Sequence, residues 1–447
     1  MPISKILETG KRSLLAYQSA INTTSSNIAN VNNPNYTRRR AELTQLITGY
    51  NSLGLSEDDS LRLRQRYAEK QWWHENQFLG QFDTNSMLLN QIENSFAEDT
   101  QSGISSLLGE FWNAWSDLAN DPDSVYARNL LRDKAKLLTD GFQRVHSDLI
   151  NLQEQIVPEI RSTANDINQK TSRLAEINER LLMGKSKDLL DERDGIIADL
   201  SKMIDIKIKE KENGTVSVFA DGLLLVSDDE VNKMEVGMTT VDGRNRVEVY
   251  LADGHKPLTI STGSIGAMIK THNETIPYYL KKLDDLAKSI ADKVNELHRT
   301  GENLNGTTNI SFFADDVSGA ADFRLNSSIE NDTSLIASHL VGEGEGSGNL
   351  AQAISDLQNE RVLNGNTIND YYTATVSELG NQIKENDSLK SSQELIVQQL
   401  QNERDSVSAV SIDEEMTKMV QYQQAYQAAA KIVTTVNQMV DTILSLK

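Results

Sequence analysis

The chain ends in the stretch SIDEEMTKMVQYQQAYQAAAKIVTTVNQMVDTILSLK, from Ser411 to Lys447. Apolar or aromatic residues recur through it at steps that alternate between three and four. These residues are Met419, Tyr422, Tyr426, Ala429, Val433, Val436, Val440 and Ile443. Such alternation is typical of a helix that packs along another helix. We therefore predict a C-terminal helix that uses this stripe, the C-terminal seam, as an assembly surface.

The first residues of the chain carry the same pattern. Its large apolar members, the N-terminal seam, are Ile3, Leu7, Leu14, Tyr17, Ile21 and Ile28. Gly10 and Thr24 occupy two further positions and dilute the stripe. A helix with so little apolar surface is marginal in isolation. We expect the two ends to pair with each other or with copies of themselves. The alternative is a pair of ordinary amphipathic helices lying on a core.

Helical patterns also fill much of the chain between the two seams. They cover residues 108–118, 124–183, 276–297 and 350–410. Pro158 is expected to kink or interrupt the second of these patterns, because proline removes a helical hydrogen bond. Gly301 is placed to end the third.

A strand pattern occupies residues 203–262. Isoleucines and valines alternate there with charged residues, and the turn sequences Asn213-Gly214 and Asp253-Gly254 predict two β-hairpins. Residues 302–348 are rich in loop formers, with a short strand expected at Phe323–Leu325 and a flexible glycine-rich linker near their end.

The predicted fold class is mainly α with a small β part (α+β). Paired terminal helices form a coiled-coil-like domain, and a long helical bundle carries the hairpins. The expected domains are 1–40 with 412–447 for the terminal helices and 41–301 with 349–411 for the bundle, and residues 302–348 are expected to be a loop-rich segment. The chain would thus run outward and return.

The composition excludes several classes of protein. The 447 residues include no cysteine, which rules out disulfides and thiolate sites. A formal net charge of −21 repels a phosphate backbone, so nucleic acid is not an expected partner. The basic run Arg38–Arg40 is interpreted as a solvated cluster. No apolar run is long enough for membrane insertion, and the N-terminus lacks a signal-peptide core.

No arrangement of reactive residues predicts catalysis. The histidines are not at metal-ligand spacing, so we expect neither a metal nor another cofactor. The carboxylates of Asp191, Glu192 and Asp194 surround Arg193, and this group is interpreted as a solvated ion-pair cluster. The sequence therefore predicts that the protein is not an enzyme.

The stretch SSNIANVNNPNYTRRRAEL, from Ser25 to Leu43, resembles the N-terminal signature of the flagellar rod, hook and hook-associated axial proteins. Its motif places asparagines at the end of a helix and in the following turn. The matching residues are Asn27, Asn30, Asn35, Tyr36, Thr37 and Arg38. The family usually has glycine where this chain has Asn35, and asparagine tolerates a left-handed backbone better than most residues. The C-terminal run QYQQAYQAAAK resembles the same family.

Two internal stretches, Leu189–Val226 and Gly263–Gly306, narrow the resemblance to the hook-associated proteins of the hook–filament junction. The resemblance implies a secreted structural subunit of the extracellular flagellum, exported by the flagellar type III pathway, that assembles with its own copies into a ring. It implies hook protein on one side, hook-associated protein 3 on the other, and an export chaperone on the C-terminal helix.

Other readings stay open at this point. The chain could be another axial protein, namely hook-associated protein 3, flagellin, or a rod or hook subunit, or it could be a coiled-coil secreted effector. Larger members of the family carry an outer β-domain in their second half, and residues 302–348 are too few to hold one.

Overall fold

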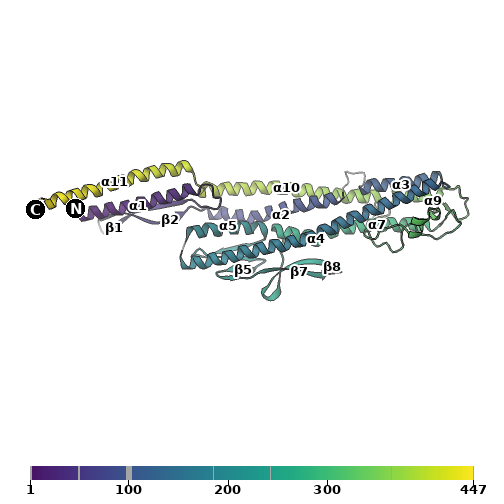
Figure 1. The fold of residues 1–447 in the computed structure, drawn as a ribbon, viewed down its shortest axis with the longest axis horizontal. Coiled ribbons are helices and arrows are strands. Elements are labelled where there is room, and N and C mark those ends of the chain that lie inside the picture. Colours follow the sequence, from purple (N-terminus) through teal and green to yellow (C-terminus); the bar gives the residue numbers. More distant parts are fainter. Residues whose placement is uncertain are drawn as a thin grey trace.

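The computed structural model describes residues 3–48, 51–96, 103–184, 186–241, 243–363 and 365–445. The molecule is a long rod with both chain termini at one end (Figure 1). Segments from the two ends of the sequence lie side by side along much of the rod, so the chain does run outward and return. The fold is mainly helical with small antiparallel sheets, as predicted.

The terminal pair consists of α1 (Ile3–Ala29) and α11 (Ile412–Ser445). The two helices are antiparallel, because Asn27 contacts Glu415 while Gly10 lies against Val433. A long hairpin of β1 (Arg39–Thr48) and β2 (Asn51–Arg62) runs beside α1. This hairpin is not among the predicted elements.

The central bundle contains long helices that run along the rod. They are α2 (Arg66–Phe96), α4 (Val125–Met183), α5 (Lys187–Met203), α7 (Ile276–His298) and α10 (Ile368–Ser408). The expected interruption of α4 is wrong, since the helix passes through Pro158. Pro158 is exposed, and the solvent side of a gently curved helix tolerates a missing hydrogen bond best.

Two small sheets cover one side of the bundle. The first has the order β3-β4-β5-β6, and the second has the order β7-β8-β9. Their bounds are β3 (Lys207–Glu210), β4 (Val216–Ala220), β5 (Leu223–Ser227), β6 (Glu230–Val231), β7 (Met234–Val241), β8 (Arg244–Leu251) and β9 (Lys256–Leu258). Both predicted turns are present, with Gly214 and Gly254 in the left-handed region that favours glycine. The η1 turn (Asp253–His255), α6 (Gly263–Lys270) and the π-helical η2 (Thr271–Thr275) lead on to α7.

The far end of the rod is a packed cap. It is built from α3 (Ile104–Asn120), β10 (Gly301–Glu302), α8 (Ser327–Asn331), η3 (Thr333–Leu335), β11 (His339–Leu340), α9 (Asn349–Asp356) and η4 (Leu357–Asn359). Phe312, Phe313 and Phe323 are fully buried and join Phe111 and Trp115 in one aromatic cluster.

The cap corrects two predictions. The predicted strand at 323–325 is wrong, because only a single bridge joins Phe313 to Leu325. Gly301 belongs to β10, and α7 already ends at His298. The loop-rich residues 302–348 pack on α3 and α4 through Phe313 and Phe323.

Asparagine side chains fasten helices to neighbouring extended segments. In each case the amide donates to the carbonyl, and accepts from the N–H, of one and the same residue. The pairs are Asn27 with Arg39, Asn168 with Met234, Asn178 with Val216, Asn273 with Val247 and Asn295 with Phe313. Each asparagine side chain thus gives a hydrogen-bond partner to a backbone carbonyl and to a backbone N–H that would otherwise be left without one.

Candidate assembly site at the elbow of the chain

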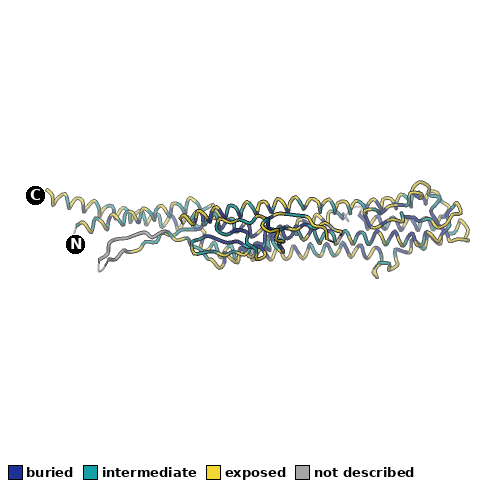
Figure 2. The backbone as a smooth tube through the Cα atoms, turned by 90° about the horizontal axis from the view of Figure 1, so that it is seen from below, coloured by how far each residue is buried: buried dark blue, intermediate teal, exposed yellow. Residues whose placement is uncertain are grey.

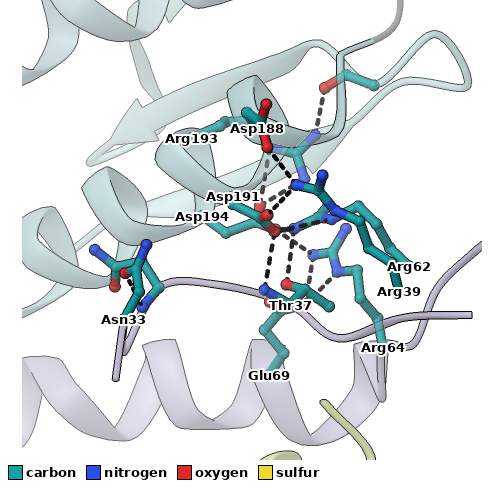
Figure 3. A network of polar contacts seen from close by, with 12 residues as sticks. Asn33, Thr37, Arg39, Arg62, Arg64, Glu69, Asp188, Asp191, Arg193 and Asp194 are labelled. Carbon is teal, nitrogen blue, oxygen red and sulfur yellow. Dashed lines mark hydrogen bonds and ion pairs between the residues drawn. The ribbon is translucent and has the colours of Figure 1, made fainter. Parts of the chain in front are cut away.

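The terminal pair joins the bundle at one place, here called the elbow. It comprises residues 27–39, the end of β2 with the start of α2, the first half of α5, and residues 408–415 (Figures 1 and 3). Asparagines, arginines and carboxylates from these four segments meet there. The elbow therefore decides how the terminal pair is held against the rest of the rod.

Asn27 is the centre of the turn motif. It is fully buried, and its Nδ2 donates to the carbonyl oxygen of Arg39 at 2.7 Å while its Oδ1 accepts from the Arg39 N–H at 3.0 Å. The Tyr36 hydroxyl donates to the same Oδ1 at 2.9 Å. Asn30 donates to the carbonyl oxygen of Ser26 at 2.8 Å and closes the end of α1.

Asn35 does not take the left-handed backbone that its position in the motif suggested. Its side chain instead lies against Gly195 of α5, so close that a Cβ there would stand 2.6 Å from Asn35 Nδ2. The glycine allows the turn to lie directly on α5.

Arg38 connects the turn to the start of α11. Its Nε donates to Glu415 Oε1 at 2.9 Å, and a terminal guanidinium nitrogen also pairs with Glu414. Asn27 Nδ2 donates to the other oxygen of Glu415, Oε2, at 2.8 Å. The Arg38 N–H donates to the carbonyl oxygen of Ser408 at 2.8 Å, so backbone and side chain both fix the junction.

On the bundle side, Asp191 gathers partners from three segments (Figure 3). It pairs with Arg62 at 2.6 Å and with Arg39 at 3.0 Å, and it accepts from the Thr37 N–H at 3.3 Å. Arg39 also reaches Asp188 at 2.5 Å. The end of the hairpin is thereby tied to α5.

A second group continues the network inward. Asp194 pairs with Arg62 at 2.8 Å and with the fully buried Arg193 at 2.5 Å. Arg64 contacts Glu69, and it reaches Glu210 of β3 at 3.2 Å. Charges from α2, α5, β2 and β3 are thus neutralised in one place.

The electrostatics of this group follow from burial and from the arginines. Burial by itself favours the neutral acid, but Arg193, Arg64 and Arg62 hold the pKa of Asp194 below its usual range. Glu210 behaves in the same way, since burial is outweighed by Arg193 and Arg64 and its pKa is lowered. Burial raises the pKa of Glu69, and the neighbouring charge of Asp194 adds to the effect.

Two interpretations of the sequence are therefore wrong. Arg38 and Arg39 are not solvated, since their side chains are each only 12% exposed, whereas Arg40 is 55% exposed. Most of the cluster around Arg193 is buried too, because Asp191 and Asp194 face the arginines of the turn and hairpin, while Glu192 is 40% exposed and pairs with Arg173. These partners lie more than a hundred residues away in the chain, so local sequence gave no sign of them.

The C-terminal seam faces α1. Ala429 and Val436 are buried and Ile443 is exposed, while the others are half-buried, namely Met419, Tyr422, Tyr426, Val433 and Val440. The large residues of the N-terminal seam are all half-buried and flank the contact. Gly10 and Asn27 contact α11, and the buried residues of α1 are all small or polar, namely Gly10, Ala16, Ala20, Thr24 and Asn27. Gly10 permits the close approach, since a Cβ there would lie 2.7 Å from Val433 Cγ2.

Exposed apolar residues are spread along α11. They are Ile412, Met416, Val420, Ile432, Met439, Ile443 and Leu444. Figure 2 shows how little of the terminal pair is buried compared with the bundle. This helix therefore retains apolar surface for further contacts.

Sequence reasoning missed Glu415, although a signal was present. Glu415 stands four residues before Met419 and so continues the alternation of the seam. A charged residue at a seam position is an anomaly that calls for a partner. Arg62 and Arg64 carried no comparable signal.

Within the described residues, no group of side chains is arranged to hold a metal ion. A search of the same residues finds no helix of the length and apolarity that a bilayer span requires.

The sequence matches three family models. The model described as the flagellar hook-associated protein FlgK helical domain matches residues 89–313, half of the chain. Residues 7–37 match the flagella basal body rod protein model, and residues 401–446 match the flagellar basal body rod FlgEFG protein C-terminal model. The two terminal matches cover most of α1 with its turn motif, and α11.

Whole-length relatives agree with these matches. Flagellar hook-associated protein 1 of Bacillus subtilis is 29% identical over 494 positions, which cover 98% of this chain and 97% of that protein. The protein of the same name from Salmonella typhimurium is 23% identical over 555 positions, covering both chains completely. The Salmonella protein therefore holds more than a hundred residues with no counterpart among the 447 present here.

A solved structure shows the same fold. The flagellar hook junction protein FlgK from Burkholderia pseudomallei superposes with a TM-score of 0.67 at 14% identity, over 76% of this chain and all of that one. The helical-domain match, the two terminal matches and the shared fold all indicate one family. The chain belongs to the family of flagellar hook-associated protein 1, FlgK.

Proposed function

We propose that the chain is a structural subunit of the bacterial flagellum that forms the junction between hook and filament. The observation that carries this proposal is the FlgK helical-domain match over residues 89–313, set between two terminal matches to axial proteins. The rod shape, with both termini at one end, suits a subunit whose terminal helices enter a common tube (Figure 1).

Assembly would use the terminal helices. The C-terminal seam pairs with α1 inside one chain, while the exposed apolar residues of α11 remain for neighbouring copies. We propose a ring of copies, with hook protein on one side and hook-associated protein 3 on the other. The buried charges of the elbow would hold each terminal pair at a fixed angle to its bundle.

Before assembly the terminal helices need protection. The exposed apolar residues of α11 leave this helix with apolar surface beyond its contact with α1, which is a liability for a free subunit. We propose that an export chaperone binds the C-terminal helix, and that the chain leaves the cell unfolded through the flagellar type III pathway.

The first prediction tests the seam. Val433→Asp places a carboxylate between α11 and α1, and burying an unpaired charge costs several kcal/mol. Cells carrying this variant should make hooks, release flagellin into the medium and show filaments on fewer than about one cell in ten. Electron microscopy counts the filaments, and circular dichroism of the purified variant should show the bundle still folded.

The matched control is Thr435→Asp, which adds the same charge to an exposed position two residues away. It should leave filament number close to that of the parent strain. Normal filaments on the Val433→Asp strain would reject the seam as the assembly surface. Antibody labelling at any position other than the hook–filament junction would reject the junction role itself.

A further inference from the structure

Glu415 is out of place for a residue of an apolar seam. It is 1% exposed, and it is one of three buried residues that α11 has within its described length, with Ala429 and Val436. The same helix leaves Ile412 and Met416 about half exposed. Burying a carboxylate while exposing apolar side chains costs free energy, so the position of Glu415 needs a reason other than stability.

Both oxygens of this carboxylate accept hydrogen bonds. Oε1 accepts from Arg38 Nε at 2.9 Å, and Lys418 Nζ lies 3.4 Å away. Oε2 accepts from Asn27 Nδ2 at 2.8 Å. Asn27 is itself held by Arg39 and Tyr36, so it cannot follow Glu415 if α11 moves. The carboxylate therefore has its full set of partners at one position only.

Apart from the close approach of Gly10 to Val433, the apolar contacts of the terminal pair define such a position weakly. Seam residues recur every seven residues along both helices. A displacement of α1 by seven residues, about 10 Å, brings seam residues opposite seam residues again, with Ile3 or Tyr17 in the place of Gly10.

We infer that Asn27, Arg38 and Glu415 form a register latch. These positioning residues set the register in which α1 pairs with α11. They thereby set where the exposed residues of α11 lie along the rod. A single buried polar residue is known to specify register in helical pairs at a cost in stability. Only the use of this register in assembly rests on the proposed junction function, because the latch itself lies within one chain.

Disulfide trapping tests the latch directly, because the chain contains no cysteine. Val433→Cys is combined in turn with Gly10→Cys, the contact seen here, and with Ile3→Cys or Tyr17→Cys, one seven-residue step to either side. Intrachain disulfides are quantified after mild oxidation of the purified full chain. With the latch intact, the 10–433 disulfide should exceed each displaced disulfide by at least about tenfold.

The three pairs are then repeated in Arg38→Met/Glu415→Met, which removes both charges together and leaves neither one buried alone. The displaced disulfides should rise to within about threefold of the native one. The matched control is Glu8→Met/Arg12→Met, which removes an exposed ion pair from α1 and should leave the tenfold ratio unchanged.

The latch is overturned if the ratio of disulfides in Arg38→Met/Glu415→Met equals that of the parent. Should circular dichroism show that this variant is unfolded, Glu415→Gln decides by the same criterion, because it keeps the shape and removes the charge. A failed latch leaves the junction function standing, since that function is tested separately by the position of the protein on flagella.

Discussion

At the scale of single residues, Asp191 illustrates how the elbow is held. Its carboxylate is 6% exposed and neutralises guanidinium groups of Arg62 and Arg39, which reach it from β2 and β1. Arg62 has a second carboxylate in Asp194, while Arg39 has its second partner in the exposed Asp188. Loss of Asp191 leaves two nearly buried cations short of partners, and that loss is the costly way to break a buried ion pair.

We therefore predict that Asp191→Ala lowers the free energy of unfolding by about 3 to 5 kcal/mol. The control is Asp199→Ala on the same helix, which removes an exposed carboxylate paired with Lys170. It should cost less than about 1 kcal/mol. Urea unfolding followed by circular dichroism measures both, and equal effects would show that the elbow charges contribute no more than surface pairs.

At the scale of secondary-structure elements, the terminal pair differs from the rest of the rod. Within the described residues, α11 buries three side chains, whereas α4 buries a continuous stripe along most of its length. Apolar burial is what offsets the entropy of ordering a helix. We predict that segments 1–35 and 412–447 are poorly ordered in the isolated monomer and helical in the assembly.

Amide hydrogen exchange of the monomer provides the measurement, with α4 as the internal standard. Amides of the terminal segments should exchange at least about a hundredfold faster than those of α4. Protection of both segments equal to that of α4 would contradict this expectation.

At the scale of the whole molecule, the two ends of the rod should respond to acid in different pH ranges. In the distal cap His298 is fully buried, its Nδ1 donates to the carbonyl oxygen of Ile310 and its Nε2 accepts from the Ala337 N–H. Burial lowers its pKa from 6.5 to about 4. Between these two pH values the unfolded chain binds a proton at His298, whereas the folded cap keeps this histidine neutral. The stability of the cap is therefore lost as the pH falls from 6.5 towards 4.

This difference in pKa corresponds to about 3 kcal/mol, so the cap should loosen first on mild acidification. Asp194 and Glu210 of the elbow have lowered pKa values, and their contribution is present above about pH 4 and lost only below it. A Trp72→Phe/Trp73→Phe variant leaves Trp112 and Trp115 as fluorescent reporters of the cap. Their emission should shift between pH 6.5 and 4, and His298→Gln should abolish most of that shift.

Much of the fold could be read from periodicity. Residue spacing reveals features that depend on near neighbours in the chain. These features include the C-terminal seam, the helical patterns of the middle and the turns at Asn213-Gly214 and Asp253-Gly254. The turn motif at Asn27–Arg38 indicated the family for the same reason.

Other features depend on partners that sequence distance conceals. Arg38 and Arg39 were interpreted as solvated because their carboxylates come from α11 and α5, and Glu415 was not singled out. Residues 302–348 looked like a loop because their aromatic side chains pack on α3 and α4 and carry no period of their own. By itself, the sequence determined the helices and their apolar stripes, since hydrophobic burial follows local spacing. Only the tertiary structure decided where the terminal pair is fastened, because charges become buried only when distant segments meet.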